Sequence, residues 1–315
     1  MIKRMEGHRS PVRAVAVSGD GKLIASGDIS GGLIVWDGDT GQWLTNDRTI
    51  KVHADIITSL DFSPGGTVLA TVSLDKTIQL WRTDSWKIQG NPINCGEAIY
   101  CVRYSPAPSS ELLAITTYTH IQIWNTSGLE PECIAKFSAD DIHASHLSLA
   151  WAADGTRLFS AGRSRDPTIR EWDALTWQQV GDPWSGHTDD VCAITLNPTG
   201  TLVASASGDN RVRLWRLSDQ RTIAIFEHLE PVYCVTFSAD SKYILCGGGN
   251  SSIIEWGIPE DAILEDSPNE QASDVSFGFC FPHCHLISLK AMLPKYAPGE
   301  RGVGFQSFPS FHVDI

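Results

Sequence analysis

Residues 186–216, with the sequence GHTDDVCAITLNPTGTLVASASGDNRVRLWR, decide the fold of this chain. They contain three short runs rich in Val, Ile, Leu, Ala and Thr, separated by the segments NPTG (197–200) and SGDN (207–210). Proline and glycine in such segments favour the backbone angles of tight turns. The stretch therefore predicts three consecutive antiparallel strands, and the apolar run 222–226 predicts a fourth.

The same unit recurs along the chain. A histidine precedes a tryptophan by 28 residues in four pairs: His8 and Trp36, His53 and Trp81, His187 and Trp215, His228 and Trp256. Trp124 and Trp172 end two further, less regular units, so six tryptophans follow one another at steps of 45, 43, 48, 43 and 41 residues. A repeat of this period, with Gly-His near its start and Trp-Asp near its end, is typical of a β-propeller blade.

These units resemble WD repeats, and the resemblance covers residues 2–256. It implies an all-β protein, a β-propeller of four-stranded antiparallel blades over residues 1–256, with six legible repeats and a seventh missing or degenerate. The repeats are similar in style to fungal WD-repeat arrays. We favour a chain that begins one blade late and ends in an unrelated tail. In such a propeller, residues 2–5 would be the outer strand of the last blade and would close the ring by removing exposed sheet edges.

Some units depart from the pattern. Ser30 stands where blade one should hold an aspartate, and blade three (98–124) has neither the histidine nor the aspartate. Blade six carries Cys246 and Asn250 at the serine and aspartate positions.

Residues 257–315 do not continue the repeat. They contain six prolines, and residues 257–276 are acidic, which predicts a linker followed by a poorly ordered tail. Cys280, His283, Cys284 and His285 are of metal-ligating types. A zinc site usually needs two separated pairs of such residues, so we expect neither a metal nor another cofactor.

Charge and composition restrict the function further. The chain has 24 basic and 37 acidic residues, a formal net charge of −13, which argues against a surface that follows nucleic-acid phosphates. It has no signal-like start and no long apolar run, so we expect a soluble intracellular, cytoplasmic protein that does not bind membranes. Its eight cysteines are scattered, which is typical of buried thiols in a reducing compartment.

Two blades carry a complete set of polar residues that invites comparison with a hydrolase: His53, Thr71, Asp75 and Trp81, and then His187, Ser205, Asp209 and Trp215. A nucleophilic serine would need an exposed hydroxyl and a site for the oxyanion. Here the hydroxyl lies within a strand, and the set recurs in two blades. The resemblance implies instead a buried hydrogen-bonded chain in each blade, so we expect no enzyme.

The resemblance also implies a binding face where the loops around the channel gather. By position, the residues expected on or beside it are Arg13, Thr58, Lys76, Tyr118, Arg165, Asn210, Arg211 and Tyr233. We therefore expect a non-enzymatic scaffold that binds protein or peptide segments on this top face. The alternatives are a substrate adaptor of a ubiquitin ligase, or a fragment of a larger signalling protein with a nucleotide-triphosphatase domain.

Overall fold

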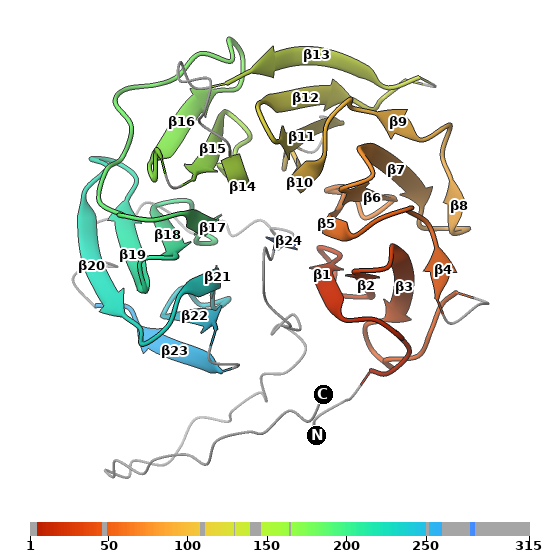
Figure 1. The fold of residues 1–315 in the computed structure, drawn as a ribbon, viewed down its shortest axis with the longest axis horizontal. Coiled ribbons are helices and arrows are strands. Elements are labelled where there is room, and N and C mark those ends of the chain that lie inside the picture. Colours follow the sequence, from red (N-terminus) through yellow and green to blue (C-terminus); the bar gives the residue numbers. More distant parts are fainter. Residues whose placement is uncertain are drawn as a thin grey trace, which may run out of the picture.

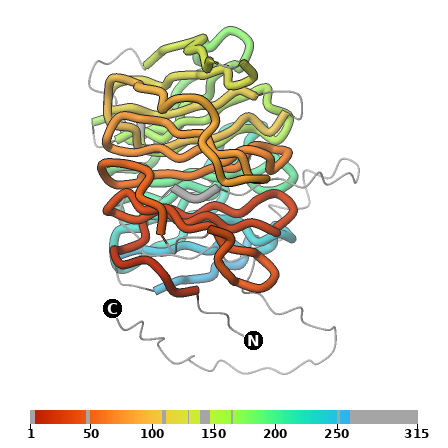
Figure 2. The backbone as a smooth tube through the Cα atoms, turned by 90° about the vertical axis from the view of Figure 1, so that its right-hand side faces the viewer, coloured from red at the N-terminus to blue at the C-terminus, as the bar shows by residue number. Residues whose placement is uncertain are grey.

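The computed structural model describes residues 5–45, 49–107, 111–128, 130–138, 146–163, 165–249, 252–259 and 278–280. All regular secondary structure in these residues is β-strand, arranged as six antiparallel sheets around a central channel (Figure 1). The prediction of a β-propeller is thus confirmed, with six blades. Figure 2, turned by 90°, shows the strands running across the thickness of the ring, with the connecting loops on its two faces.

Each blade begins with its inner strand beside the channel and proceeds outward. Blades one to three comprise β1 (Val12–Val17), β2 (Leu23–Asp28), β3 (Gly32–Asp37) and β4 (Ile50–Lys51); β5 (Ile57–Phe62), β6 (Val68–Ser73), β7 (Thr77–Arg82), β8 (Lys87–Ile88) and β9 (Ile93–Asn94); and β10 (Ile99–Tyr104), β11 (Leu112–Thr117), β12 (Ile121–Asn125) and β13 (Glu132–Phe137).

The later blades follow the same order. Blades four to six comprise β14 (His146–Trp151), β15 (Arg157–Gly162) and β16 (Ile169–Asp173); β17 (Val191–Leu196), β18 (Leu202–Ser207), β19 (Arg211–Arg216) and β20 (Thr222–Glu227); and β21 (Val232–Phe237), β22 (Tyr243–Gly248) and β23 (Ile253–Gly257). Blade six thus has three strands among the described residues.

The hydrophobic core lies between the blades. Because successive side chains of a strand point to opposite faces of its sheet, each blade presents one apolar face to the blade before it and one to the blade after it. In blade two, for example, Leu60 and Leu69 belong to one buried cluster with Ala14 and Leu33 of blade one. Of the six cysteines whose side chains the structure describes, five are buried and all six are free thiols.

The junction between blade six and blade one differs from the others. The inner strands of successive blades pack against each other from β1 through β5, β10, β14 and β17 to β21, whereas in the described part of the chain β21 and β1 share no comparable interface. A short strand, β24 (Gly278–Cys280), pairs antiparallel with β1 on the channel side (Figure 1). Of the closing strand expected at residues 2–5, only Met5 lies within the described residues, and it packs on blade one.

Candidate partner-binding face

Two kinds of segment meet on one face of the ring, which we call the top face. They are the segments that lead into each inner strand and the turns between the second and third strands. Backbone bonds join them directly: Ile29 N–H donates to the carbonyl of Pro11 at 3.0 Å, and Leu74 N–H to that of Ile56 at 3.2 Å. The equivalent bond recurs in blades five and six. In each of these four blades the two loops therefore lie side by side on the top face.

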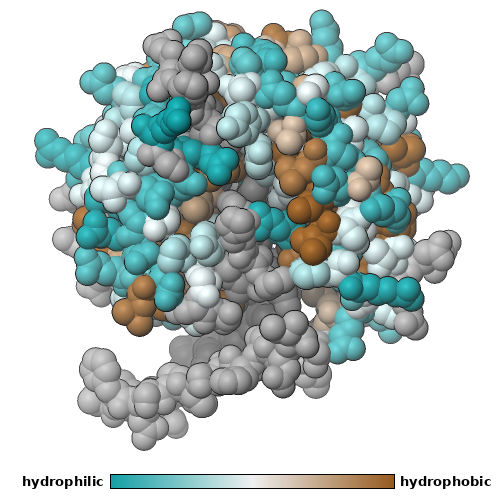
Figure 3. Space-filling model, viewed as in Figure 1, coloured by the Kyte–Doolittle hydropathy of each residue, from teal (hydrophilic) through white to brown (hydrophobic). Residues whose placement is uncertain are grey.

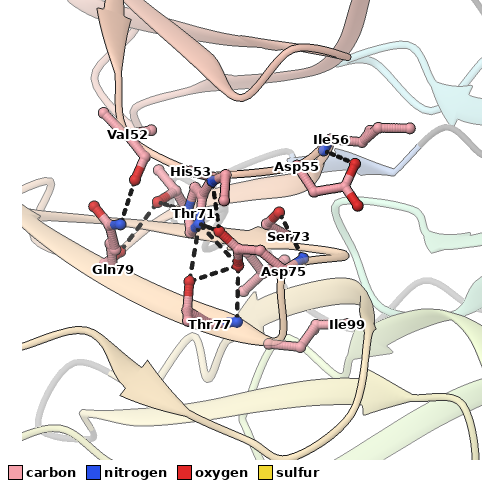
Figure 4. A network of polar contacts seen from close by, with 12 residues as sticks. Val52, His53, Asp55, Ile56, Thr71, Ser73, Asp75, Thr77, Gln79 and Ile99 are labelled. Atoms are coloured by element: carbon pink, nitrogen blue, oxygen red, sulfur yellow. Dashed lines mark hydrogen bonds and ion pairs between the residues drawn. The ribbon is translucent and has the colours of Figure 1, made fainter.

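In blade two, a chain of side chains fixes these loops to the strands (Figure 4). Trp81 Nε1 donates to Thr71 Oγ1 at 3.3 Å, and the Thr71 hydroxyl donates to His53 Nε2 at 2.8 Å. His53 Nδ1 donates to Asp75 Oδ2 at 3.0 Å. Burial lowers the pKa of His53 although the Asp75 carboxylate acts in the opposite direction, so the neutral imidazole is favoured.

Blade five repeats this geometry with shorter bonds. Trp215 Nε1 donates to Ser205 Oγ at 2.8 Å, Ser205 donates to His187 Nε2 at 2.7 Å, and His187 Nδ1 donates to Asp209 Oδ2 at 2.9 Å. Asp209 also accepts the backbone N–H groups of Thr188 and Arg211. Since the Ser205 hydroxyl is buried and bonded on both sides, we propose that the eight residues of these two sets stabilise the blades and take no part in chemistry.

The expectation that blade one lacks the aspartate is wrong. His8 Nδ1 donates to Asp28 Oδ2 at 2.8 Å, and His8 Nε2 bonds Ser26, which also accepts from Trp36 Nε1 at 2.9 Å. The carboxylate comes from the end of β2 instead of the following turn. There it also accepts the backbone N–H and the hydroxyl of Ser30. A carboxylate two residues earlier thus completes the same bonded chain.

The remaining blades replace parts of the chain with other residues. In blade three Trp124 Nε1 donates to Gln122 at 3.1 Å, and in blade four Asp166 accepts from Arg170 at 2.8 Å in place of a histidine. In blade six His228 Nδ1 instead bonds the backbone of Glu230 in its own loop. His228 Nε2 has no hydrogen-bond partner among the described residues.

Every inner strand carries a β-bulge at its second residue, on the top-face side. The pairing with the second strand skips one residue at these positions in all six blades. A bulge redirects a side chain away from the regular alternation. The skipped residues surround the channel mouth: Arg13, Thr58, Tyr100, Leu147, Cys192 and Tyr233. Arg13, Tyr100 and Tyr233 are partly exposed, whereas the other three are buried.

Tyr100 escaped the sequence prediction. In the predicted set, the bulge residue is placed five residues after the Gly-His histidine of its repeat. Blade three has no such histidine, so the spacing gives no position for its bulge. Its distance to Trp124 is also one residue longer than the 23 residues that separate Tyr233 from Trp256.

The predicted contact residues differ in their accessibility. Lys76, Tyr118 and Arg165 are exposed in turns between second and third strands, and Asn210 occupies such a turn with a left-handed φ of 66°. Arg211 begins β19 and pairs with Glu227 of the outer strand at 3.4 Å.

Thr58 does not belong to the accessible surface. It is buried, and its hydroxyl donates to the carbonyl of Ile99 in the next blade at 2.7 Å. This residue therefore joins blades two and three and is not available to a partner.

Apolar side chains are exposed on the top-face loops. Tyr118 is 58% exposed, Leu229 is 89% exposed and Ile29 is 42% exposed. Ile56 and Leu74, both partly exposed, lie in the neighbouring loops of blade two. Figure 3 shows hydrophobic residues gathered beside the centre of the ring, over β1 and β5 of Figure 1. Exposed apolar groups at a rim of loops are typical of an interaction surface.

Acidic groups lie between these apolar residues. Asp55, Glu97, Asp189, Asp190 and Glu230 stand in the segments that lead into inner strands. Arg163 Nε of blade four lies 3.6 Å from Asp190 Oδ2 of blade five and partly offsets the negative charge of these carboxylates.

The described residues contain no cluster of three or more His, Cys, Asp or Glu side chains suited to a metal. The side chains of Cys280, His283, Cys284 and His285 lie outside the described part of the chain. None of the described residues forms a helix that could cross a membrane.

Comparison with known proteins agrees with the fold. The model of the family "WD domain, G-beta repeat" matches residues 1–37, 44–82, 132–173, 178–216 and 220–256. The pre-mRNA-processing factor 19 of Oryza sativa subsp. japonica is 24% identical over 88% of this chain and 53% of its own length. The THO complex subunit 3 of Arabidopsis thaliana is 26% identical, over 77% of this chain and 75% of its own length.

A guanine nucleotide-binding protein subunit beta of Zea mays is 23% identical over 81% of this chain and 70% of its own length. The chain thus spans about half the length of the factor 19 relatives that it matches. Blade three has neither the histidine nor the aspartate, and its first three strands, β10 to β12, fall between the segments that the family model matches. Because those segments cover more than half of the chain, the chain belongs to the WD-repeat family.

Proposed function

We propose that this protein is a non-enzymatic interaction scaffold whose top face binds an extended segment of a protein partner. The observation that carries the proposal is the set of exposed apolar side chains on one face, Ile29, Tyr118 and Leu229, around a channel mouth bordered by Arg13, Tyr100 and Tyr233. Tyrosine and arginine are favoured anchors at protein interfaces because they combine large contact area with hydrogen bonding.

The charge of the molecule supports a protein partner over a nucleic acid. The net charge is −13, and the loops before the inner strands add carboxylates around the channel mouth. A phosphate backbone would be repelled by this arrangement, whereas a neutral or basic peptide would be attracted. The printed names of the relatives include subunits of a complex and of a G protein, which supports a role in assemblies. They also include a pre-mRNA-processing factor.

The test compares variants of exposed apolar side chains on opposite faces. Tyr118→Ala with Leu229→Ser removes two exposed apolar side chains from the top face. Leu175→Ser is the matched control, because Leu175 is 88% exposed and lies on the opposite face, where Ala174 N–H donates to the carbonyl of Thr156. Partners captured by the wild-type chain and identified by cross-linking should bind the top-face variant at least tenfold more weakly.

The control should retain these partners, with both variants melting as the wild type does. Retention by the double variant, or loss in the Leu175 variant, would contradict the assignment of the binding face.

A further inference from the structure

The apolar face that blade one turns toward blade six has no blade packed on it in the described residues. We call it the seam face. Its residues are Val12, Val15, Val17, Ile24 and Trp36. The corresponding positions of blade two are Ile57, Leu60, Phe62, Leu69 and Trp81, and these pack on blade one. In blade five, Val191, Ile194, Leu196, Val203 and Trp215 pack on blade four in the same way.

The seam face is nevertheless buried. Val15, Val17, Ile24 and Trp36 are each at most 6% exposed. Among the described residues, their hydrophobic cluster consists of residues of blade one and Met5. Trp43 lies against Trp36, with ring centroids 6.3 Å apart. The side chains of Val15, Val17 and Ile24, nearer the channel, need a different packing partner.

Blade six does not provide that cover. Its residues on the side of blade one are Cys234, Thr236, Leu245, Ile253 and Glu255, at positions where blade five has Ala193, Thr195, Ala204, Val212 and Leu214. Ile253 is 45% exposed, and Glu255 is exposed as well. A carboxylate at an inter-blade position is unfavourable for dry packing. Blade six therefore ends the row of packed blades.

The chain itself supplies a suitable occupant. β24 pairs Ala14, Val15 and Ala16 with Cys280, Phe279 and Gly278, so the chain after residue 280 starts beside the inner strand of blade one. Residues 281–315 are rich in apolar side chains, including Phe281, Phe305, Phe308 and Phe311, and contain only five charged residues. The linker before them, residues 260–277, has six acidic residues and no basic one. Burial of apolar surface is favourable for such a segment and for the seam face alike.

We propose that residues 281–315 pack against the seam face of blade one and close the ring there in place of a seventh blade. The segment lacks the Gly-His and Trp spacing of the repeats, so the closing element is not itself a WD blade. Its 35 residues, at up to about 3.3 Å per residue, are long enough to cross the seam more than once.

The first experiment separates the tail from the ring without removing it. A site-specific protease sequence is inserted between Asp266 and Ser267 of the full chain, and the cut protein is passed through a gel-filtration column. The tail should elute with the ring at the mass of one chain. Tail eluting alone, while the ring keeps its melting temperature, would refute the proposal. A ring of doubled mass without the tail would also refute it, since a second copy would then cover the seam face.

The second experiment tests the position of the contact. Val17→Ser changes the seam face of blade one, and Ile253→Ser changes the facing side of blade six at an exposed position. In the cut protein, at a temperature where the circular dichroism of both rings is native, Val17→Ser should weaken tail retention about tenfold and Ile253→Ser should leave it unchanged. Equal retention by the two variants would overturn the assignment.

If Val17→Ser fails to fold, trypsin digestion of the intact wild type replaces it. Cleavage after Lys290, Lys295 and Arg301 should be slower than after the exposed Arg221. Faster cleavage in the tail would contradict the proposal.

Discussion

The first three strands of blades five and six pair in the same register, but the two blades differ in their polar interior. In blade five every member of the chain from Trp215 to Asp209 is hydrogen bonded. In blade six Cys246 replaces the serine, and His228 Nε2 has no hydrogen-bond partner in the part of the chain that the structure describes. The two inner hairpins nevertheless pair in the same register, with a bulge at the same position. Apolar packing between blades therefore suffices to form the blade, and the polar chain adds local stability to it.

The largest difference between these blades should come from their tryptophans. Trp215→Ala removes a fully buried indole from the cluster between blades four and five and breaks the bond to Ser205. It should lower the free energy of unfolding by about 3–5 kcal/mol. Trp256→Ala removes a half-buried ring whose centroid lies 5.4 Å from that of Phe226, and should cost about 1–2 kcal/mol. Denaturant titration of the two variants measures both values. Equal losses would show that the polar chain contributes nothing.

The next effect comes from the carboxylate. Asp209→Ala leaves His187 Nδ1–H and the backbone N–H of Thr188 without their acceptor, so stability should fall by about 1–3 kcal/mol. Glu230→Ala is the control in blade six, because His228 bonds the backbone of Glu230 and not its carboxylate. It should change stability by less than about 0.5 kcal/mol. Similar thermal shifts in the two variants would contradict the role of the Asp209 network.

The sequence predicted the regular features of the blades far better than the places where a blade departs from the repeat. Period, turn residues and the Gly-His and Trp positions suffice for the blades because each unit folds by local antiparallel pairing. Asp28 was missed because a carboxylate can reach His8 from the end of the strand as well as from the turn. Tyr100 was missed because no histidine marks blade three. The seam between blades one and six depends on contacts between distant segments, and no local pattern encodes them.

Blade six can be made to resemble blade five by one substitution. Cys246→Ser places a hydroxyl where it can donate to the unpartnered His228 Nε2 and accept from Trp256 Nε1, as Ser205 does in blade five. Stability should rise by about 1 kcal/mol. The control is Cys234→Ser, because the Cys234 thiol already donates to the carbonyl of Gly247 and should gain no new partner. Differential scanning fluorimetry of the two variants and the wild type compares their melting temperatures. A rise with Cys234→Ser, or none with Cys246→Ser, would contradict the comparison.

The smallest effect is a pH dependence that Asp209 should give blade five. Burial raises the pKa of Asp209. The hydrogen bond and the electrostatic attraction from His187, together with the hydrogen bond from the backbone N–H of Thr188, outweigh burial and hold this pKa below its ordinary value of 3.8. The unfolded chain therefore takes up this proton before the folded chain does.

The resulting stabilisation is present above pH 3.8 and is lost as the pH falls through the folded-state pKa. The wild type should therefore lose stability relative to Asp209→Asn over this range. Urea titrations of both proteins between about pH 3 and pH 6 measure the difference. The uncharged, exposed change Leu175→Ser should give a flat difference against the wild type. An Asp209→Asn difference that is equally flat would mean that this carboxylate titrates alike in the folded and unfolded chains, and that its bond to His187 does not distinguish blade five from blade six.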